Sequence, residues 1–427
     1  MDASKSISRE REQGPGLWLE SQSMQPGIRQ TEGAHIKRKR IMHLKIMKFT
    51  KVVLITACCT IGYGVYAQTP PNSIPTVSLD NVARHGFFYA GGKYVGDAGR
   101  ETMGGAMYVE VMIPKEIRHP HPVVFLHGAG QTGVDFLQTP DGRPGWAYDF
   151  LDMGYVVYIQ DFPARGRSQY VPGVDGDMNI RNAPNIEQVF TASAATADFP
   201  QASKHTQWPG TGRMGDPVFD DFMRTQVAFI GGRQAQLTID ANVALLDMIG
   251  TPVILLTHSQ GGWFGWNIAD ERPEKVVAIV TLEPAAPPIR GVDTTNVVYR
   301  ERGGLAWGVG NTPITYDPPA GDASELQVVI EDQADEEGLV PCYVQQEPAR
   351  QLVNLTHIPV LFMNGEAGYH RIFDHCLARW LNQAGVQTEY VRMEDVGLTG
   401  NGHMMMLEEN SAEIAEYIGG WLENNLD

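Results

Sequence analysis

Short runs of apolar and β-branched residues alternate with longer stretches of helical periodicity over most of the chain. Continuous apolar runs are expected where a strand is buried on both faces of a sheet, whereas apolar residues three and four positions apart favour a helix. The predicted strands are Ala106–Ile113, Pro122–His127, Tyr155–Gln160, Pro252–Thr257, Val276–Leu282, Pro359–Met363 and Glu389–Met393. The predicted helices are Gln234–Ile249, Trp263–Ala269, Phe373–Ala384 and Ser411–Glu423. This alternation predicts an α/β fold in which helices cover both faces of a mostly parallel sheet of about eight strands.

Two long segments, 162–232 and 284–357, interrupt this alternation. Both are rich in Gly, Pro, Asn and Asp, and both show weak periodicity. Structureless loops of this length are uncommon inside a compact domain, and most of those that occur carry function. Since each segment follows a predicted strand, we expect the two segments to form cap elements over a pocket.

The N-terminal region predicts an export signal. Three lysines between positions 45 and 51 precede the apolar run Val52–Ile61, and Val65 and Ala67 stand three and one positions before a cut at Gln68. This pattern is typical of a secretory signal peptide, and it predicts a secreted or periplasmic protein. A lipoprotein signal with Cys58 as the lipidated residue is the alternative. The predicted parts of the chain are a non-native or disordered lead-in over 1–46, a signal peptide over 47–67 and one domain over 68–427.

The charge balance argues against anionic partners. Residues 1–67 carry 11 of the 33 Lys and Arg residues and 5 of the 50 Asp and Glu residues, so the remainder has a net charge of −23. Such a surface repels phosphate backbones and anionic lipids, and we therefore expect no nucleic-acid partner. Beyond the N-terminal region, no stretch approaches the roughly twenty apolar residues that a membrane span needs.

Only two cysteines, Cys342 and Cys376, remain once the signal is removed. Export favours a disulfide between them, but the sequence does not supply the geometry that pairing needs, and the pairing is left open. No cysteine pattern has metal-ligand spacing, and we expect neither a metal nor a cofactor.

The strongest chemical motif follows the strand predicted to end at Thr257. The strand runs directly into Ser259, which is flanked by His258 and Gln260 and followed by two glycines and a helix. This is the strand–turn–helix context of a nucleophile elbow, usually written G-x-S-x-G, in which small neighbours let strand and helix approach. Thr257 stands where the motif usually has Gly, and we expect Gly261 to make room for it. An ordinary loop with a surface serine is the alternative.

A second buried run ends in His127-Gly128, which is followed by Ala129. Next to a nucleophile elbow, a backbone N–H after such a pair and the N–H after the nucleophile commonly bind the oxyanion of the reaction. We therefore expect the N–H groups of Ala129 and Gln260 to form an oxyanion hole. A phosphate-binding loop is the alternative, but it would need a Lys followed by Ser or Thr at the right spacing.

The best candidate base is His403, in a Gly-rich loop between the last predicted strand and the C-terminal helix. The chain order Ser, acid, His is that of a nucleophile-elbow hydrolase, and a loop after the final strand can deliver the base to the serine. His127 and His258 lie beside motif residues and are expected to shape the pocket. Trp263 and Tyr316 are candidates for its apolar lining, with core packing as an equal alternative. The histidines expected to be surface or structural residues are His119, His121, His370 and His375.

Three carboxylates compete for the role of the acid. Glu283 ends an apolar strand at the sheet edge where ligands bind, and its carboxylate could accept the Nδ1–H of His403. The usual acid follows the next strand, but the expected Asp position there is occupied by Gly368. Glu283 is therefore preferred, and Glu366 and Asp374 remain alternatives.

Taken together, these motifs resemble the α/β-hydrolase superfamily, and within it the secreted bacterial esterases whose acid is a Glu after the sixth strand. The matching motifs are Phe87–Gly92, His127-Gly128 with Gln131–Gly133, Thr139–Trp146, Arg165–Ser168, His258–Gly261, Glu283-Pro284, Ile314–Pro319 and Gly402–Met406. The resemblance implies Ser259 as the nucleophile, His403 as the base and Glu283 as the acid. The best-known member has adjacent cysteines where this chain has Ala129 and Gly130, so no vicinal disulfide is carried over.

Motifs and resemblance together predict a serine hydrolase that cleaves a small or apolar carboxylic ester through an acyl-enzyme. An amidase, lactonase or carbon–carbon hydrolase could use the same triad, and an inactive hydrolase scaffold used for binding is the alternative outside the enzymes. Hydrolases with an Asp nucleophile are disfavoured because Ser259 stands at that position. The expected partner is a small-molecule ester, and the oligomeric state, a homodimer included, is left open.

Overall fold

The computed structural model describes residues 74–284 and 286–426. The predicted lead-in, signal peptide and cleavage site lie outside these residues. Among the helices of the described ranges, none has both the length and the apolar character needed to cross a membrane.

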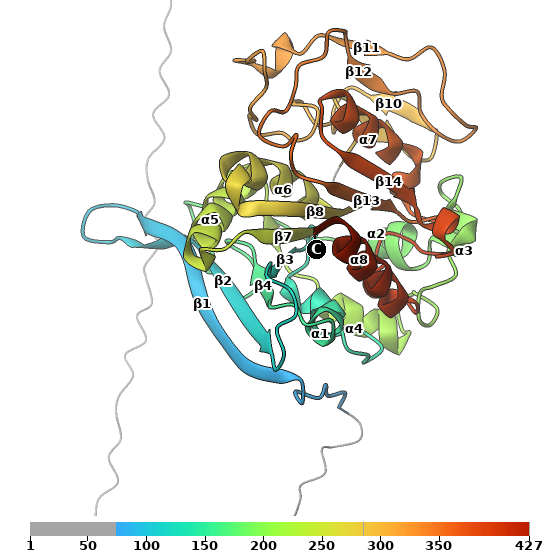
Figure 1. Cartoon of the computed structure of the whole chain (residues 1–427). Coiled ribbons are helices and arrows are strands. Elements are labelled where there is room, and N and C mark those ends of the chain that lie inside the picture. Colours follow the sequence, from blue (N-terminus) through green and yellow to red (C-terminus); the bar gives the residue numbers. More distant parts are fainter. Residues whose placement is uncertain (1–73, 285, 427) are drawn as a thin grey trace, which may run out of the picture. The chain divides into compact units, whose positions relative to one another are not determined.

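An eight-stranded sheet forms the centre of the fold, in the order β1-β2-β4-β3-β7-β8-β13-β14 (Figure 1). Its strands are β1 (Val82–Val95), β2 (Thr102–Pro114), β3 (Val123–Leu126), β4 (Val157–Asp161), β7 (Val253–His258), β8 (Val276–Leu282), β13 (Val360–Asn364) and β14 (Thr388–Arg392). β2 pairs antiparallel with both β1 and β4, whereas every pair from β4 to β14 along this order is parallel. The predicted sheet is confirmed, and β1 is the strand that the apolar pattern did not predict.

The central strands are buried on both faces. Every residue of β3 and β7 is buried, as their continuous apolar sequences predict. Along β3, Val123 and Phe125 belong to one core cluster, and Val124 and Leu126 belong to another. Because successive strand side chains point to opposite faces, these two clusters lie on the two sides of the sheet.

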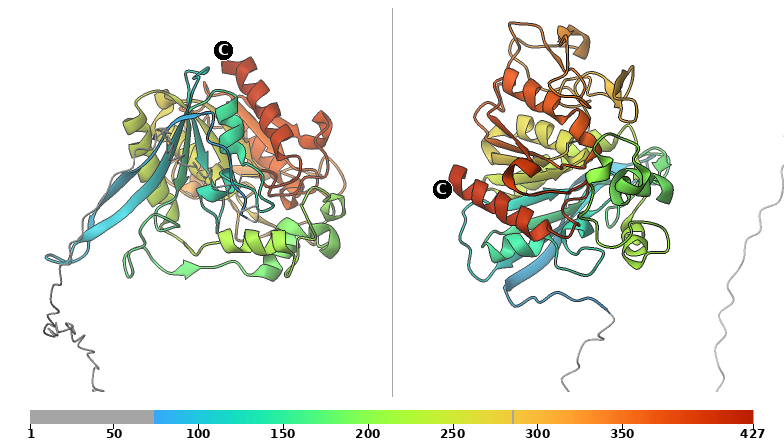
Figure 2. Two further views of the ribbon diagram at one scale, coloured as in Figure 1. Left: turned by 90° about the horizontal axis from the view of Figure 1, so that it is seen from below. Right: turned by 90° about the vertical axis from the view of Figure 1, so that its right-hand side faces the viewer.

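Helices lie on both faces of the sheet, as the sequence predicts (Figure 2). The main helices are α1 (Trp146–Asp152), α5 (Gln234–Ile249), α6 (Gln260–Glu271), α7 (Asp374–Gln383) and α8 (Ser411–Leu426). Helices α5, α6 and α7 contribute to the cluster of Val124, and helices α1 and α8 contribute to the cluster of Val123. Helix α5 ends where predicted because Gly250 follows it at a φ of 78°, the left-handed conformation that commonly terminates a helix.

The two insertions contain short elements only. The first holds β5 (Met178–Asn179), α2 (Ala183–Ile186), the π-helix η2 (Glu187–Thr191), α3 (Ser193–Thr196), α4 (Pro217–Thr225) and β6 (Phe229–Ile230). The second holds β9 (Gly291–Asp293), β10 (Val298–Arg300), β11 (Val328–Ile330) and β12 (Tyr343–Gln345). Residues of both insertions meet α7 in a small apolar cluster that contains Phe199, Val340 and Phe373.

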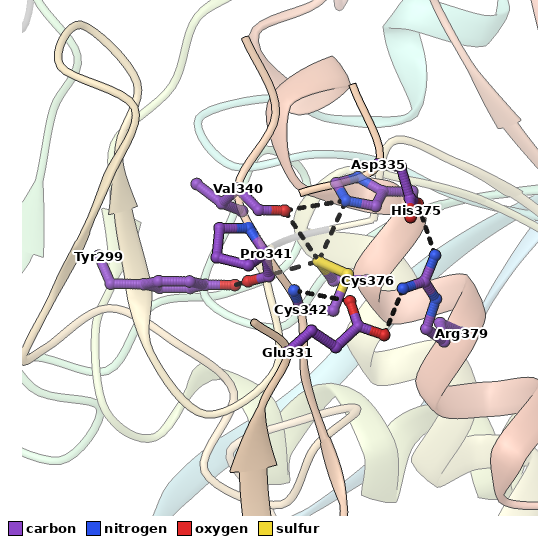
Figure 3. Close-up of a disulfide and its surroundings, with 9 residues drawn as sticks. All are labelled: Tyr299, Glu331, Asp335, Val340, Pro341, Cys342, His375, Cys376 and Arg379. Atoms are coloured by element: carbon purple, nitrogen blue, oxygen red, sulfur yellow. Dashed lines mark hydrogen bonds and ion pairs between the residues drawn. A yellow bond between two sulfur atoms is a disulfide. The ribbon is translucent and has the colours of Figure 1, made fainter. Parts of the chain in front are cut away.

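A disulfide between Cys342 and Cys376 ties the second insertion to α7 (Figure 3). The pairing that the sequence left open is therefore present. Beside it, Arg379 of α7 makes ion pairs with Glu331 and Asp335 of the insertion. The two cysteines are separated by 34 positions in the sequence. By the chain-entropy relation, closing a loop of this length raises the free energy of the unfolded state by about 4 kcal/mol.

Candidate active site

Ser259 and Glu283 leave neighbouring parallel strands at the same edge of the sheet. The last residues of β7 and β8, His258 and Leu282, are register partners, and the two candidates follow them directly. The backbone continues the ladder for one more step: Ser259 N–H donates to Leu282 O at 3.0 Å, and Glu283 N–H donates to Met363 O at 3.1 Å. This is the carboxyl edge of the parallel strands, where α/β sheets bind ligands.

Ser259 stands on a strained turn between β7 and α6. Its φ of 51° and ψ of −121° are unfavourable for a residue with a side chain, and such strain persists only where the surroundings enforce it. The turn brings α6 close to β3, since a Cβ on Gly261 would lie 2.6 Å from Leu126 O. The strand–turn–helix arrangement that the sequence predicts around Ser259 is therefore present.

The expectation that Gly261 makes room for Thr257 is wrong. A Cβ on Gly265, one helical turn further along α6, would lie 3.0 Å from Thr257 Cγ2. The bulk of Thr257 is accommodated by that glycine, and its hydroxyl donates to Thr281 Oγ1 on the neighbouring strand at 2.9 Å.

The structure brings His403 and Glu283 together. Nδ1 of His403 lies 2.7 Å from Oε2 of Glu283, and both side chains are buried. The other carboxylate oxygen of Glu283 accepts the N–H of Gly365 at 2.9 Å. The imidazole is thereby held by its Nδ1, while its Nε2 is buried and has no hydrogen-bond partner among the described residues.

The two alternative acids are engaged elsewhere. Glu366 accepts the N–H of Gly400 at 2.9 Å and pairs with Lys204 at 3.0 Å. Asp374 lies 3.0 Å from Nδ1 of His370. Of the three candidates, only Glu283 therefore contacts the ring of the candidate base.

Burial shifts the pKa values of Glu283 and His403 in opposite directions. It raises the pKa of Glu283 and lowers the pKa of His403 well below its usual 6.5. The neighbouring His370 lowers the pKa of His403 further. The ring is therefore neutral at pH 7, and with Nδ1–H directed at Glu283, its Nε2 lone pair can accept a proton.

Four rings surround His403. Phe190 from the first insertion and His370 both stack on it, each with centroids 4.9 Å away, and Tyr369 lies at 5.0 Å. His258 approaches to 4.6 Å, and its Nε2 bonds the backbone oxygen of His403 at 2.9 Å. Since burial keeps His258 neutral, this Nε2 carries the proton and donates it.

His370 is therefore not a surface residue. It is fully buried against the candidate base. No motif or periodicity in residues 365–370 indicates this burial. Phe190 was also missed, because it lies in an insertion without helical or strand periodicity.

A second buried network fixes the loop that carries His403. Glu408 accepts the backbone N–H of Gly402 at 2.9 Å and a side-chain N–H of Asn401 at 2.7 Å. Its carboxylate also contacts Nε2 of His205 at 2.9 Å, and Nδ1 of the same ring contacts Ser193 Oγ at 3.0 Å. His205 and Ser193 belong to the first insertion, which therefore contacts both the ring and the loop of the candidate base.

The loop after β3 lies beside Ser259. A Cβ on Gly128 would lie 3.2 Å from Ser259 Cβ. The carbonyl of Gly128 accepts from Arg165 Nη1 and from His127 Nδ1, each at 2.9 Å. Because a trans peptide directs its C=O and N–H to opposite sides, these bonds direct the N–H of Ala129 away from Arg165. No described residue accepts a hydrogen bond from the N–H of Ala129.

Arg165 joins this loop to the start of α6. Its Nη2 donates to Gln260 Oε1 at 3.0 Å and to Gln234 Oε1 at 2.9 Å. Arg165 is only 2% exposed, and burial lowers the pKa of its guanidinium to about 9. Gln260 is the first residue of α6, so its N–H is one of the four that lack a partner within the helix. Sequence reasoning noted Arg165 only within a motif, although its position just after β4 marks the same sheet edge.

Tyr316, a predicted pocket residue, lies in the core instead. Its hydroxyl donates to Trp307 O at 2.8 Å and accepts from Trp380 Nε1 at 3.0 Å, within the cluster under α5, α6 and α7. Trp263 is half-buried and packs against the same cluster. His127 is buried, and its Nε2 accepts the N–H of Phe162, so it shapes the loop of Gly128.

Two clusters among the described residues have the ligand types that bind metals. Glu283, His370 and His403 place ligand atoms within 4.8 Å of one another, as do Cys342, His375 and Cys376. The cysteines are consumed by the disulfide. In the first cluster, Nδ1 of His403 and Oε2 of Glu283 are already engaged in a hydrogen bond with each other.

Comparisons with known proteins identify the family and the fold. Residues 123–417 match the model of the "Alpha/beta hydrolase family". The chain is 44% identical over 340 residues to "Probable secreted lipase phiG" from Fungal sp. (strain ATCC 74256), covering 79% of this chain and 89% of that protein. It is 48% identical over 56 residues to "Lipase LipV" from Mycobacterium tuberculosis, covering 12% of this chain and 22% of that one. A solved structure described as a "Novel Bacterial Esterase" aligns over 84% of this chain and 99% of its own, with a TM-score of 0.54 at 22% identity, which shows a shared fold.

Proposed function

Since the chain belongs to the alpha/beta hydrolase family, we propose that it is a serine hydrolase that cleaves a small or apolar carboxylic ester through an acyl-enzyme. The observation that carries this proposal is the 2.7 Å contact between His403 Nδ1 and Glu283 Oε2, at the sheet edge that also presents Ser259. A lipase and an esterase among the similar proteins favour ester substrates over amides or lactones.

In the proposed reaction, His403 Nε2 takes the hydroxyl proton of Ser259 while Oγ attacks the ester carbonyl carbon. Glu283 stabilises the imidazolium that forms and keeps the ring oriented. The tetrahedral intermediate collapses, the alkoxide leaves with the proton from Nε2, and the acyl group stays on Oγ. Water, deprotonated by Nε2, then attacks the acyl carbonyl carbon; the bond between this carbon and Oγ breaks, Oγ takes the proton from Nε2, and the carboxylic acid is released.

The N–H groups of Ala129 and Gln260 are the proposed oxyanion donors. Arg165 and His127 hold the Gly128 carbonyl, so the adjoining N–H of Ala129 is fixed before substrate arrives. Such preorganised donors are worth about 3 to 4 kcal/mol each in measured acyl-transfer enzymes. Arg165 also holds the side chain of Gln260, and it therefore acts on both proposed donors.

We also propose that the protein is exported and that the first insertion is a cap. The name of the fungal relative, a probable secreted lipase, supports export. The cap is supported by the stacking of Phe190 on His403 and by the low exposure of Ser259, which is 8%.

The proposed function is tested by hydrolysis of 4-nitrophenyl esters of increasing acyl length, with Ser259→Ala as the control. We expect saturable hydrolysis of acetate or butyrate that the variant lacks. Hydrolysis of matched anilides or lactones but not of esters would show that the substrate is an amide or a lactone instead of a carboxylic ester. A folded protein inactive on all three would favour the binding-scaffold alternative.

A further inference from the structure

Arg181, at the edge of the candidate active site, is a cation with no counter-ion among the residues that the structure describes. The described arginines that pair with carboxylates are Arg143, Arg167, Arg224, Arg272, Arg300, Arg371, Arg379 and Arg392. Arg181 pairs with no carboxylate of a described residue, and its Nη1 donates to the neutral amide oxygen of Asn185 at 3.2 Å. Its Nε is buried and has no hydrogen-bond partner within the same residues.

Arg181 belongs to the first insertion, and its side chain reaches the loop after β3 that carries Gly128, Ala129 and Gly130. Its Cδ would lie 3.5 Å from a Cβ on Gly130, which directly follows the proposed oxyanion donor Ala129. Its guanidinium carbon lies 5.1 Å from the ring centroid of Phe190, and that ring stacks on His403. Arg181 thus lies between the oxyanion loop and the ring that covers the base.

Electrostatic effects agree with this placement. After burial and His370, the charge of Arg181 is a further cause that lowers the pKa of His403. It also opposes the effect of burial on the pKa of Tyr369, and it helps to lower the pKa of Arg165. Two guanidinium groups without a carboxylate partner therefore act on the same region, in a chain whose formal net charge is −17.

We propose that Arg181 binds a carboxylate carried by the ester substrate, so that the enzyme prefers monoesters of dicarboxylic acids or esters of carboxylated alcohols. An unpaired, partly buried guanidinium is costly, and a carboxylate is the group that its planar donors bind best. The stem of Arg181 lies against the loop, because a Cβ on Gly130 would be in ordinary van der Waals contact with Arg181 Cδ and Cγ, at 3.5 and 3.7 Å. This inference rests on the proposed ester hydrolysis and names its substrate class.

The test compares two matched ester pairs. The acyl-side pair is 4-nitrophenyl hemiglutarate and its methyl-capped analogue, and the alcohol-side pair is 4-carboxyphenyl acetate and its methyl ester. We expect the carboxylate form of at least one pair to have the higher kcat/KM at low salt. Arg181→Gln should lower that value about 10- to 100-fold, the range of a charge-assisted hydrogen bond, while the neutral partner changes little. Arg181→Lys should retain part of the preference.

Arg224→Gln is the matched control, because Arg224 lies in the same insertion but pairs with Asp221 on the surface. An equal loss on charged and neutral esters would overturn the proposal and leave Arg181 as a support for Phe190. No change on any ester would also overturn it.

A binding measurement separates this inference from the proposed function. Titration of Ser259→Ala with 4-nitrophenyl hemiglutarate and 4-carboxyphenyl acetate, followed by calorimetry, reports affinity without turnover. Affinity for one of them that Arg181→Gln removes would support the carboxylate site even if hydrolysis failed. Equal affinity with and without Arg181 would refute the site even if hydrolysis were observed.

Discussion

Glu283 and Gly368 share one side-chain site: a Cβ on Gly368 would lie 1.9 Å from Oε1 of Glu283. Glu283 follows β8, and Gly368 follows the adjacent strand β13. A side chain can therefore enter this space from either strand, but not from both. In this chain the carboxylate comes from β8, and the absence of a side chain at position 368 is the matching feature of the sequence.

Replacement of Glu283 tests its role as the acid. Glu283→Gln should lower kcat by about 10³- to 10⁴-fold, because the amide cannot stabilise the imidazolium and favours the wrong tautomer. Glu366→Gln is the control, since that carboxylate bonds Gly400 and Lys204 instead. Ester hydrolysis and circular dichroism would be measured on both variants. A large loss in Glu366→Gln with little effect in Glu283→Gln would return the acid to β13.

Substitution of Gly368 tests the shared site. Gly368 has a φ of −70° and a ψ of 142°, which any residue adopts, so the restriction is one of space alone. Gly368→Ala should therefore destabilise the fold and displace Glu283, at a cost of about 1 to 3 kcal/mol. The double variant Gly368→Ala, Glu283→Ala should be more stable than the two single effects predict when added. Additive unfolding free energies in urea would contradict the shared site.

The pH dependence follows from the lowered pKa of His403. Above that pKa the ring is neutral and Nε2 accepts the serine proton, whereas below it Nε2 is protonated and activity is lost. We expect the acid limb of kcat/KM to have its midpoint below 6.5, as a property of the coupled His403–Glu283 pair. The protein would be returned to pH 7.5 after each measurement to confirm that it remains folded. A midpoint above 6.5 would show that burial does not dominate.

The strands that carry the candidate site could be predicted because their signal is local. β7 and β8 are continuous apolar runs whose ends are marked by Ser259 and Glu283, and parallel pairing brings such ends together. The candidate base His403 was chosen from chain order, and its contact with Glu283 supports that choice. The edge strand β1 was not predicted, because most of its side chains are exposed and its apolar run is limited to Phe87–Ala90.

The surroundings of the triad could not be predicted, because they depend on contacts between distant segments. Phe190 and Arg181 come from an insertion without periodicity, and their proximity to His403 appears only in three dimensions. Tyr316 shows the opposite failure. Its aromatic ring suggested a place in the pocket lining. In the structure its hydroxyl forms hydrogen bonds with Trp307 and Trp380 within the core.

Asp135 should make the folded state sensitive to alkaline pH. It is 2% exposed, neither carboxylate oxygen has a hydrogen-bond partner among the described residues, and burial raises its pKa from 3.8 to about 8. The folded state therefore holds a proton that the unfolded chain releases above pH 4, and stability falls as pH rises towards 8. Asp135→Asn should raise the unfolding free energy at pH 8, by at most about 6 kcal/mol, and flatten its change between pH 5 and 8.

Urea unfolding at the two pH values measures this effect, with the surface variant Asp221→Asn as the control. A loss of stability in Asp135→Asn at pH 8 would show that the carboxylate is ionised and stabilising in the folded state.

The central claim is that Ser259 is an activated nucleophile, and a fluorophosphonate probe tests it without knowledge of the substrate. The intact mass of residues 68–427 would be measured after treatment, beside Ser259→Ala and Glu283→Gln. We predict one adduct on the unmodified chain, none on Ser259→Ala and slow labelling of Glu283→Gln. An adduct that persists in Ser259→Ala, or no adduct on a folded chain, would contradict the claim.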